Sequence, residues 1–159
     1  MSLRYMNHCD TLSMKDVDTG SRDASMGKSF YKVEIPSTYE AMTDILDSAV
    51  EALVRERCIC DKDMPCMRLC LEEALVNAVR HGNCSDVARK VSVEIFGNEE
   101  NCTIRVGDEG SGFSPESIRP PCCDQLGGRG IVLIQHYMDK VKYIKKDNCL
   151  EMTFRRKSS

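Results

Sequence analysis

The sequence lacks the features that mark membrane, secreted and nucleic-acid-binding proteins. No run approaches about 18 consecutive apolar residues, so no transmembrane helix and no membrane partner are expected. The polar segment 1–28 has no apolar signal core, which argues against secretion and favours a cytoplasmic protein. Lys and Arg total 22 against 25 Asp and Glu, a formal net charge of −3, so direct nucleic-acid binding is not expected. The 159 residues are about one domain's worth, with 42% hydrophobic and 30% charged residues.

Ten cysteines are many for a chain of this length. Because no export signal is present, reduced thiols are expected rather than a disulfide framework. The densest group is Cys58, Cys60, Cys66 and Cys70, whose spacing fits poorly to the Cys-x2-Cys pairs of zinc sites. Cys66 and Cys70 are one helical turn apart and suit small buried apolar side chains. No structural metal is therefore expected.

The chain divides into a flexible N-terminal arm, residues 1–27, and one domain, residues 28–157. The arm is polar and shows no apolar period. In the domain, alternating patterns predict strands over 28–35, 90–96, 102–106, 140–145 and 150–155, and helical periods predict helices over 39–57, 63–81 and 131–138. Strands and helices do not alternate regularly. This order predicts an α+β fold, with helices on one face of a mixed, mainly antiparallel sheet.

The first candidate motif is Glu73-Ala-Leu-Val-Asn77 on the predicted helix 63–81. Residues four apart share a helix face, and this pair lies away from the centre of the apolar arc. A carboxylate can accept a proton, and an amide oxygen beside it can bind Mg²⁺. Taken alone, the spacing is more typical of a solvated polar face, so both interpretations stay open.

The second candidate motif is Asp108-Glu-Gly-Ser-Gly-Phe113, directly after a predicted strand. Two glycines separated by one residue let a backbone approach a flat ligand closely. The carboxylate of Asp108 can accept hydrogen bonds from an exocyclic amine, the group that distinguishes adenine from guanine. Without further context, an ordinary Asp-Gly turn is the commoner explanation.

The third candidate motif is Gly127-Gly-Arg-Gly-Ile131, at the start of an apolar helix. Glycines at a helix N-terminus leave backbone N–H groups free to hold phosphates. Arg129 offers a charge-assisted contact to a phosphate or to Glu73. A glycine cluster alone also fits a plain flexible loop.

Together and in this order, the three motifs resemble the N box and the two glycine boxes of the GHKL (histidine-kinase-like) ATPase superfamily. More narrowly, the stretches 73–82 and 127–139 look like those of bacterial anti-sigma-factor serine/threonine kinases. The resemblance covers roughly residues 28–156. It implies a Bergerat-type two-layer sandwich with ATP and Mg²⁺ as cofactors, and a short ATP lid over 114–126.

The resemblance also implies a role for each candidate residue. Glu73 would be the base that activates the attacking hydroxyl, with Arg129 as the second catalytic residue. Asn77 would bind the Mg²⁺ that bridges the phosphates, and Asp108 would hold the adenine amine. The remaining nucleotide-binding positions would be Gly110 and Gly112 around adenine, and Gly128, Gly130 and Ile131 around the phosphates.

The function implied is an ATP-dependent protein serine/threonine kinase that is also an anti-sigma factor. It would bind a sigma factor and phosphorylate an anti-anti-sigma protein of STAS type; a homodimer is a further implied partner. One alternative is an ATP-binding regulatory module without kinase activity. A histidine-kinase fragment would need an acceptor histidine on an additional helical hairpin, and His8, His81 and His136 do not lie on one.

Overall fold

The computed structural model describes residues 27–111 and 129–157 of the chain. The expected lid, Gly112, Gly128 and all but the last residue of the expected arm lie outside these ranges. The helices and strands are β1 (Lys28–Pro36), α1 (Tyr39–Arg55), η2 (Asp61–Asp63), α2 (Met64–Val76), η3 (Asn77–Gly82), β2 (Lys90–Gly97), β3 (Asn101–Asp108), α3 (Arg129–Tyr137), β4 (Lys140–Ile144), η5 (Lys145–Asp147) and β5 (Cys149–Arg155).

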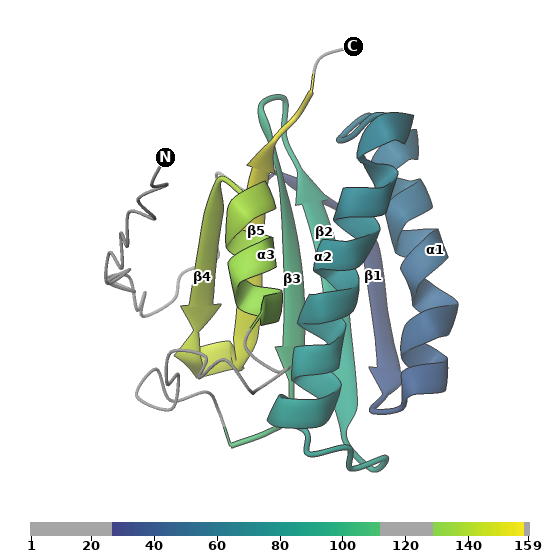
Figure 1. Cartoon of the computed structure of the whole chain (residues 1–159), viewed down its shortest axis with the longest axis vertical. Helices are drawn as coiled ribbons and strands as arrows, with labels where there is room; N and C mark the ends of the chain where they lie inside the picture. The colour runs from purple at the N-terminus through teal and green to yellow at the C-terminus, as the bar shows by residue number, and fades with distance from the viewer. Residues whose placement is uncertain (1–26, 112–128, 158–159) are drawn as a thin grey trace, which may run out of the picture.

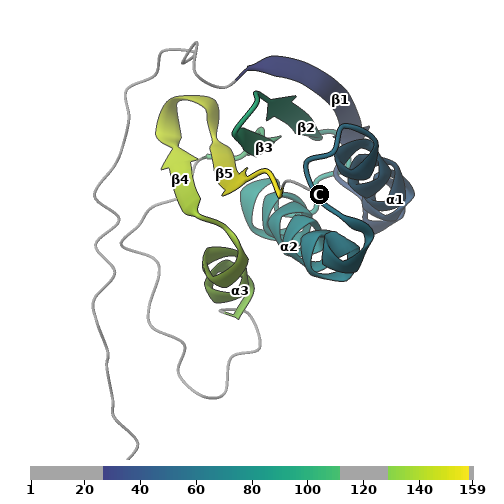
Figure 2. The ribbon, with the colours of Figure 1, turned by 90° about the horizontal axis from the view of Figure 1, so that it is seen from above.

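The five strands form one sheet in the order β1-β2-β3-β5-β4. All four pairings between described strands are antiparallel. Among the residues that the structure describes, the helices α1, α2 and α3 all lie on one face of the sheet (Figure 1; Figure 2). The expected α+β fold with helices on one face is therefore confirmed.

Helix α1 begins after a side-chain cap at Thr38. The Thr38 hydroxyl accepts a hydrogen bond from the Ala41 N–H at 3.2 Å, which satisfies one of the free donors of the first turn. The neighbouring Ser37, which also carries a hydroxyl, is buried. The apolar side of α1 packs on the sheet through residues that recur at helical spacing: Met42, Ile45, Leu46, Ala49, Val50, Ala52 and Leu53.

Helix α2 lies across the middle of the sheet beside α1 and α3 (Figure 1). Its buried side contains Met67, Leu71 and Leu75, as the periodicity predicts. The facing strand β2 contributes the alternating residues Val91, Val93 and Ile95, all fully buried. This packing fixes the helix that carries the first candidate motif.

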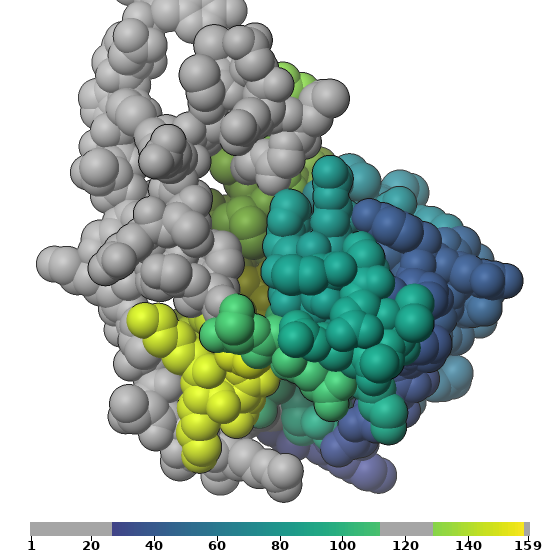
Figure 3. All heavy atoms as spheres, turned by 90° about the horizontal axis from the view of Figure 1, so that it is seen from below, coloured from purple at the N-terminus to yellow at the C-terminus, as the bar shows by residue number. Residues whose placement is uncertain are grey.

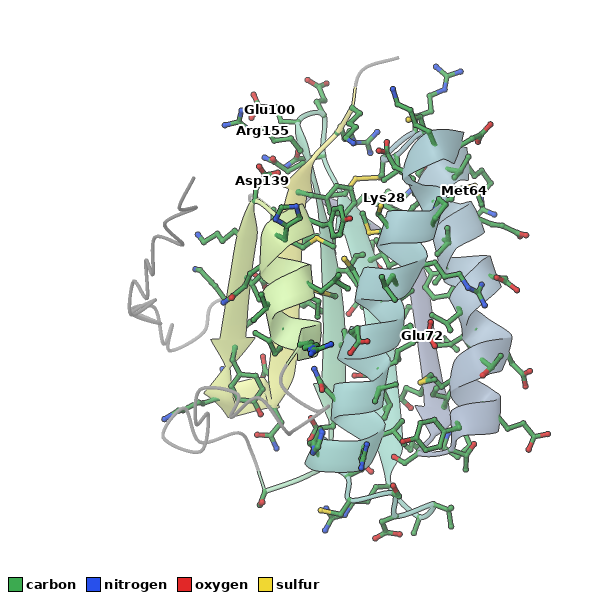
Figure 4. All side chains as sticks on the ribbon, in the orientation of Figure 1. Lys28, Met64, Glu72, Glu100, Asp139 and Arg155 are labelled. Carbon is green, nitrogen blue, oxygen red and sulfur yellow. A yellow bond between two sulfur atoms is a disulfide. The ribbon has the colours of Figure 1, made fainter. Side chains whose placement is uncertain are left out.

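Two cysteines that were expected to be reduced form a disulfide. Cys58 follows α1 and Cys102 lies in β3, 44 residues later, and their Cα atoms are 6.1 Å apart. The expectation failed because the fold, not the local spacing, brings these two residues together. The bond lies at the end of the molecule where Met64 is labelled (Figure 4). Cys70, in contrast, is a buried free thiol as expected, and burial raises its pKa to about 11.

The sheet face opposite the three helices carries charges that alternate in sign across the strands. In register from β1 to β4, the row consists of Lys32, Glu94, Arg105, Glu151 and Lys142. The Lys32 and Glu94 side chains are 3.6 Å apart, and the Arg105 guanidinium lies 2.8 Å from the Glu151 carboxylate. The Arg105–Glu151 pair is mostly buried, with 18% and 14% of the two side chains exposed.

Candidate functional site

Glu73 lies in α2 and Asn77 lies one turn later, at the C-cap of that helix, and both are half-buried. The Asn77 N–H donates to the carbonyls of Glu73 and Ala74, which keeps the two residues in helical register. The α-helix ends at Val76, whereas the sequence predicted one helix as far as His81. From Asn77 to Gly82 the chain continues as a π-helical turn, a wider turn that often occurs at functional sites.

The π-helical turn ends against the second candidate motif. A Cβ added at Gly82 would overlap the Asp108 carboxylate, and one added at Gly110 would overlap the Gly82 carbonyl. Both positions therefore need glycine for close approach rather than for a positive φ. In the view from below, the teal atoms that follow α2 lie against the green atoms that follow β3 (Figure 3). The turn that continues the helix of the first motif is thus in direct contact with the second motif.

The third motif joins the site through Gly130, the second residue of α3. Gly130 is buried, and a Cβ at this position would overlap Oε2 of Glu73. The Glu73 carboxylate therefore lies against the first turn of α3, where the helix dipole favours a negative charge. The structure thus brings Glu73 of the first motif against Gly130 of the third; Glu72, the neighbour of Glu73, is labelled at about the middle of α2 (Figure 4).

Asp108 has the electrostatics of a partly buried acceptor. Burial raises the pKa of its carboxyl, and the Gly110 N–H and the positive charge of Arg89 oppose this shift. Its Oδ1 accepts from the Gly110 N–H at 2.8 Å. Among the residues that the structure describes, no group donates to Oδ2, so this oxygen can accept a hydrogen bond from a ligand amine.

The side chains at this site suit Mg²⁺ only if a nucleotide supplies further oxygen ligands. Within residues 27–111 and 129–157, no three His, Cys, Asp or Glu side chains are grouped to hold a metal ion. The Asn77 amide oxygen, one turn from the Glu73 carboxylate, fits Mg²⁺, which prefers oxygen ligands and keeps few protein contacts. Asn77 as a ligand of Mg²⁺ remains a prediction.

The other predicted site residues have fewer contacts that bear on their predicted roles. Arg129 is exposed at the first position of α3, and it forms no ion pair with Glu73 within the described ranges. Ile131 is half-buried and packs against the core. The roles of both residues stay predictions, as do those of Gly112 and Gly128 outside the described ranges.

Gly82 and Asn83 contribute to the site, although in the sequence they look only like an ordinary end to the predicted helix 63–81. Asn83 is fully buried, and its side-chain oxygen accepts from the Glu109 N–H beside Asp108. No sequence signal separates this role from a cap, because its partner lies 26 residues away.

The antiparallel sheet with three helices on one face, and the contacts of Gly82 with Asp108 and of Gly130 with Glu73, agree with the ATPase class that the three motifs resemble. The chain belongs to the histidine kinase-like ATPase domain family, whose sequence profile matches residues 35–154. The resemblance inferred from the three motifs is thereby confirmed, and an ATPase domain implies ATP binding.

One curated relative is named as a serine/threonine-protein kinase, BtrW of Bordetella bronchiseptica. It is 25% identical over 93 residues, which cover 55% of this chain and 66% of the relative. The match therefore spans slightly less than two thirds of the relative's length. Separately, no helix in the described part of the chain is long and apolar enough to cross a membrane.

Proposed function

We propose that this protein is an ATP-dependent protein serine/threonine kinase that acts as a cytoplasmic anti-sigma factor. It binds a sigma factor, and it phosphorylates an anti-anti-sigma protein of STAS type, so that one partner is exchanged for the other. The name of the relative supports the kinase activity. The observation that carries the proposal is the contact of the Glu73 carboxylate with Gly130. This contact places a candidate base beside a helix N-terminus, the kind of backbone structure that binds phosphates.

In the proposed reaction, the acceptor hydroxyl attacks the γ-phosphorus of ATP. The new P–O bond forms as the bond to the oxygen of the ADP leaving group breaks, and the hydroxyl proton passes to the Glu73 carboxylate. Backbone N–H groups at the start of α3 hold phosphate oxygens, and the Asp108 carboxylate accepts from the adenine amine. Bound through Asn77, Mg²⁺ supplies charge neutralisation at the phosphates.

The proposed kinase activity is tested with ATP labelled at the γ-phosphate and a panel of purified STAS proteins. We expect Ser or Thr labelling of one acceptor by the parent and none by Glu73→Gln, which keeps the size of the side chain but cannot take the proton. ADP binding should persist in the variant. Glu72→Gln, a change of the neighbouring carboxylate, is the matched control and should label the acceptor like the parent.

The outcomes separate the two candidate functions. Equal labelling by the parent and by Glu73→Gln removes Glu73 from the role of base. ATP binding without labelling of any acceptor, combined with sigma-factor binding, identifies a regulatory module without kinase activity. A magnesium-dependent rise in melting temperature with ATP or ADP, larger than with GTP, tests the nucleotide site separately because a ligand that binds only the folded state stabilises it.

A further inference from the structure

Four backbone groups of the Asp108–Gly110 turn form hydrogen bonds. The Asp108 N–H donates to the Asn148 carbonyl at 3.0 Å, and the Glu109 N–H donates to Oδ1 of Asn83 at 2.8 Å. The Gly110 N–H donates to the Asp108 carboxylate, and the Gly110 carbonyl accepts from Nδ2 of Asn148 at 2.7 Å. Two asparagines from distant parts of the chain therefore hold the turn.

Asn83 anchors the turn to the body of the domain. Its side-chain amide donates to the Ser37 hydroxyl at 2.5 Å and to the Lys90 carbonyl at 2.8 Å, while its oxygen accepts from Glu109. The Asn83 N–H also donates to the carbonyl of Ala78, within the π-helical turn. A fully buried amide whose donors and acceptor are all used is a rigid support, because each lost partner would leave a buried polar group unpaired.

Asn148 anchors the same turn to the β4–β5 connection. Its backbone is left-handed, with φ 45° and ψ 52°, a conformation that asparagine tolerates better than most residues. This conformation turns the Asn148 carbonyl toward the Asp108 N–H and the side-chain amide toward Gly110. The yellow atoms of this connection lie beside the green atoms of the turn in the view from below (Figure 3).

The two supports determine where the free oxygen of Asp108 points. Oδ1 is held by the Gly110 N–H, so the carboxylate cannot rotate without breaking that bond. Gly82 packs against the carboxylate on one side, and Oδ2 remains for a ligand. Selectivity for an amine depends on the position of this oxygen, since a misplaced acceptor loses the directional part of the hydrogen bond.

We propose that Asn83 and Asn148 are specificity-determining positioning residues, which hold the Asp108 turn so that its free oxygen meets the exocyclic amine of adenine. This inference rests on the proposed nucleotide site and adds the residues that make it selective. Neither asparagine itself touches the base. Their removal is expected to reduce the preference for a purine that carries the amine, rather than to weaken all nucleotides equally.

The test compares ADP with purine riboside diphosphate, which lacks only the 6-amine, by titration calorimetry with Mg²⁺. The measured quantity is the ratio of the two Kd values. Asn148→Gly is the main variant, because glycine keeps the left-handed backbone and the carbonyl but removes the side-chain donor. We expect the preference for ADP to fall about tenfold in Asn148→Gly and in Asn83→Ala. Thr153→Ala, which removes one partner of the Thr103–Thr153 hydrogen bond and no contact of the Asp108 turn, is the control and should keep the parent's ratio.

The outcomes distinguish this inference from the proposed function. A parent protein that binds neither nucleotide refutes the nucleotide site itself. A parent that prefers ADP, with variants that keep its ratio or that weaken both nucleotides equally, overturns the positioning role and leaves the site intact. Asn148→Gly decides the question if Asn83→Ala fails to fold. A parent without any preference for ADP also overturns the inference.

Discussion

Replacement of Gly82 by alanine should displace the Asp108 carboxylate and weaken adenine nucleotide binding. The added Cβ would overlap the carboxyl carbon and both oxygens of Asp108. The φ of Gly82 is not positive, so the backbone accepts alanine, and the change from glycine contributes up to about 1 kcal/mol to helix stability. The variant should therefore fold, and the overlap should be relieved by movement of the carboxylate or of its turn.

The expected magnitude follows from the hydrogen bond that is lost. A hydrogen bond to a charged group contributes about 1.5–3 kcal/mol, which corresponds to an increase in Kd of roughly 10- to 150-fold. Titration calorimetry with ADP and Mg²⁺ measures this change directly. In an Asp108→Ala background the atoms that the added Cβ would meet are absent. Gly82→Ala should then weaken ADP binding by less than about 0.5 kcal/mol beyond the effect of Asp108→Ala alone.

The matched control for Gly82→Ala is Gly97→Ala. A Cβ at Gly97 would also meet a flexible side chain, at 2.7 Å from Nη2 of Arg156, but in the β2–β3 hairpin rather than at the site. The Kd of this control should equal that of the parent. A folded Gly82→Ala protein with the parent's Kd, or additive effects in the double-mutant cycle, would refute the placement of Asp108 against the nucleotide.

Three further predictions concern catalysis, stability and pH. Gly130→Ala should slow phosphoryl transfer by about 10²-fold at saturating ATP, because its Cβ displaces the Glu73 carboxylate that is proposed as base. Reduction of the Cys58–Cys102 disulfide should lower the free energy of unfolding by about 4 kcal/mol, the loop-entropy value for a 44-residue separation, as measured by urea unfolding. The Kd for ADP should rise as the pH falls through the raised pKa of Asp108, at a higher pH than for an exposed carboxyl, because protonation removes the charged acceptor.

Each of these predictions has its own control. Val132→Ala changes an exposed residue of the same helix as Gly130 and should leave transfer unchanged; an unimpaired Gly130→Ala enzyme would contradict the Glu73 contact. Cys102→Ser should unfold identically with and without reductant, and the same behaviour in the parent would argue against the disulfide. Asp108→Asn should flatten the pH profile of binding, and a pH-independent parent would exclude Asp108 as the titrating group.

The sequence predicted the elements well because their signals are local. Helix α1 has both an apolar stripe and the Thr38 cap within a few residues of each other, and both appear in the structure. The strands β2 and β3 alternate clearly and are joined by a short polar hairpin. The three motifs could be assigned to one site because their order along the chain resembles a known family.

The features that escaped prediction depend on contacts between distant residues. Ser37 has the chemistry of a helix cap, yet its hydroxyl is used by Asn83, 46 residues away. Cys58 and Cys102 are 44 residues apart, and only the fold brings them together. The π-helical turn after Val76 is also not visible in the periodicity, because a single widened turn changes the spacing of only a few residues.

The charged row on the sheet face opposite the three helices also constrains how the strands find their partners during folding. A slip of β5 by two residues against β3 would set Arg105 opposite Thr153 or Cys149 in place of Glu151, and the most buried ion pair of the row would be lost. A slip by one residue would carry Glu151 to the core side of the sheet. Incorrect alignments therefore leave a charge without its partner. The charged residues of this row thus help the chain to select one native pairing of its strands.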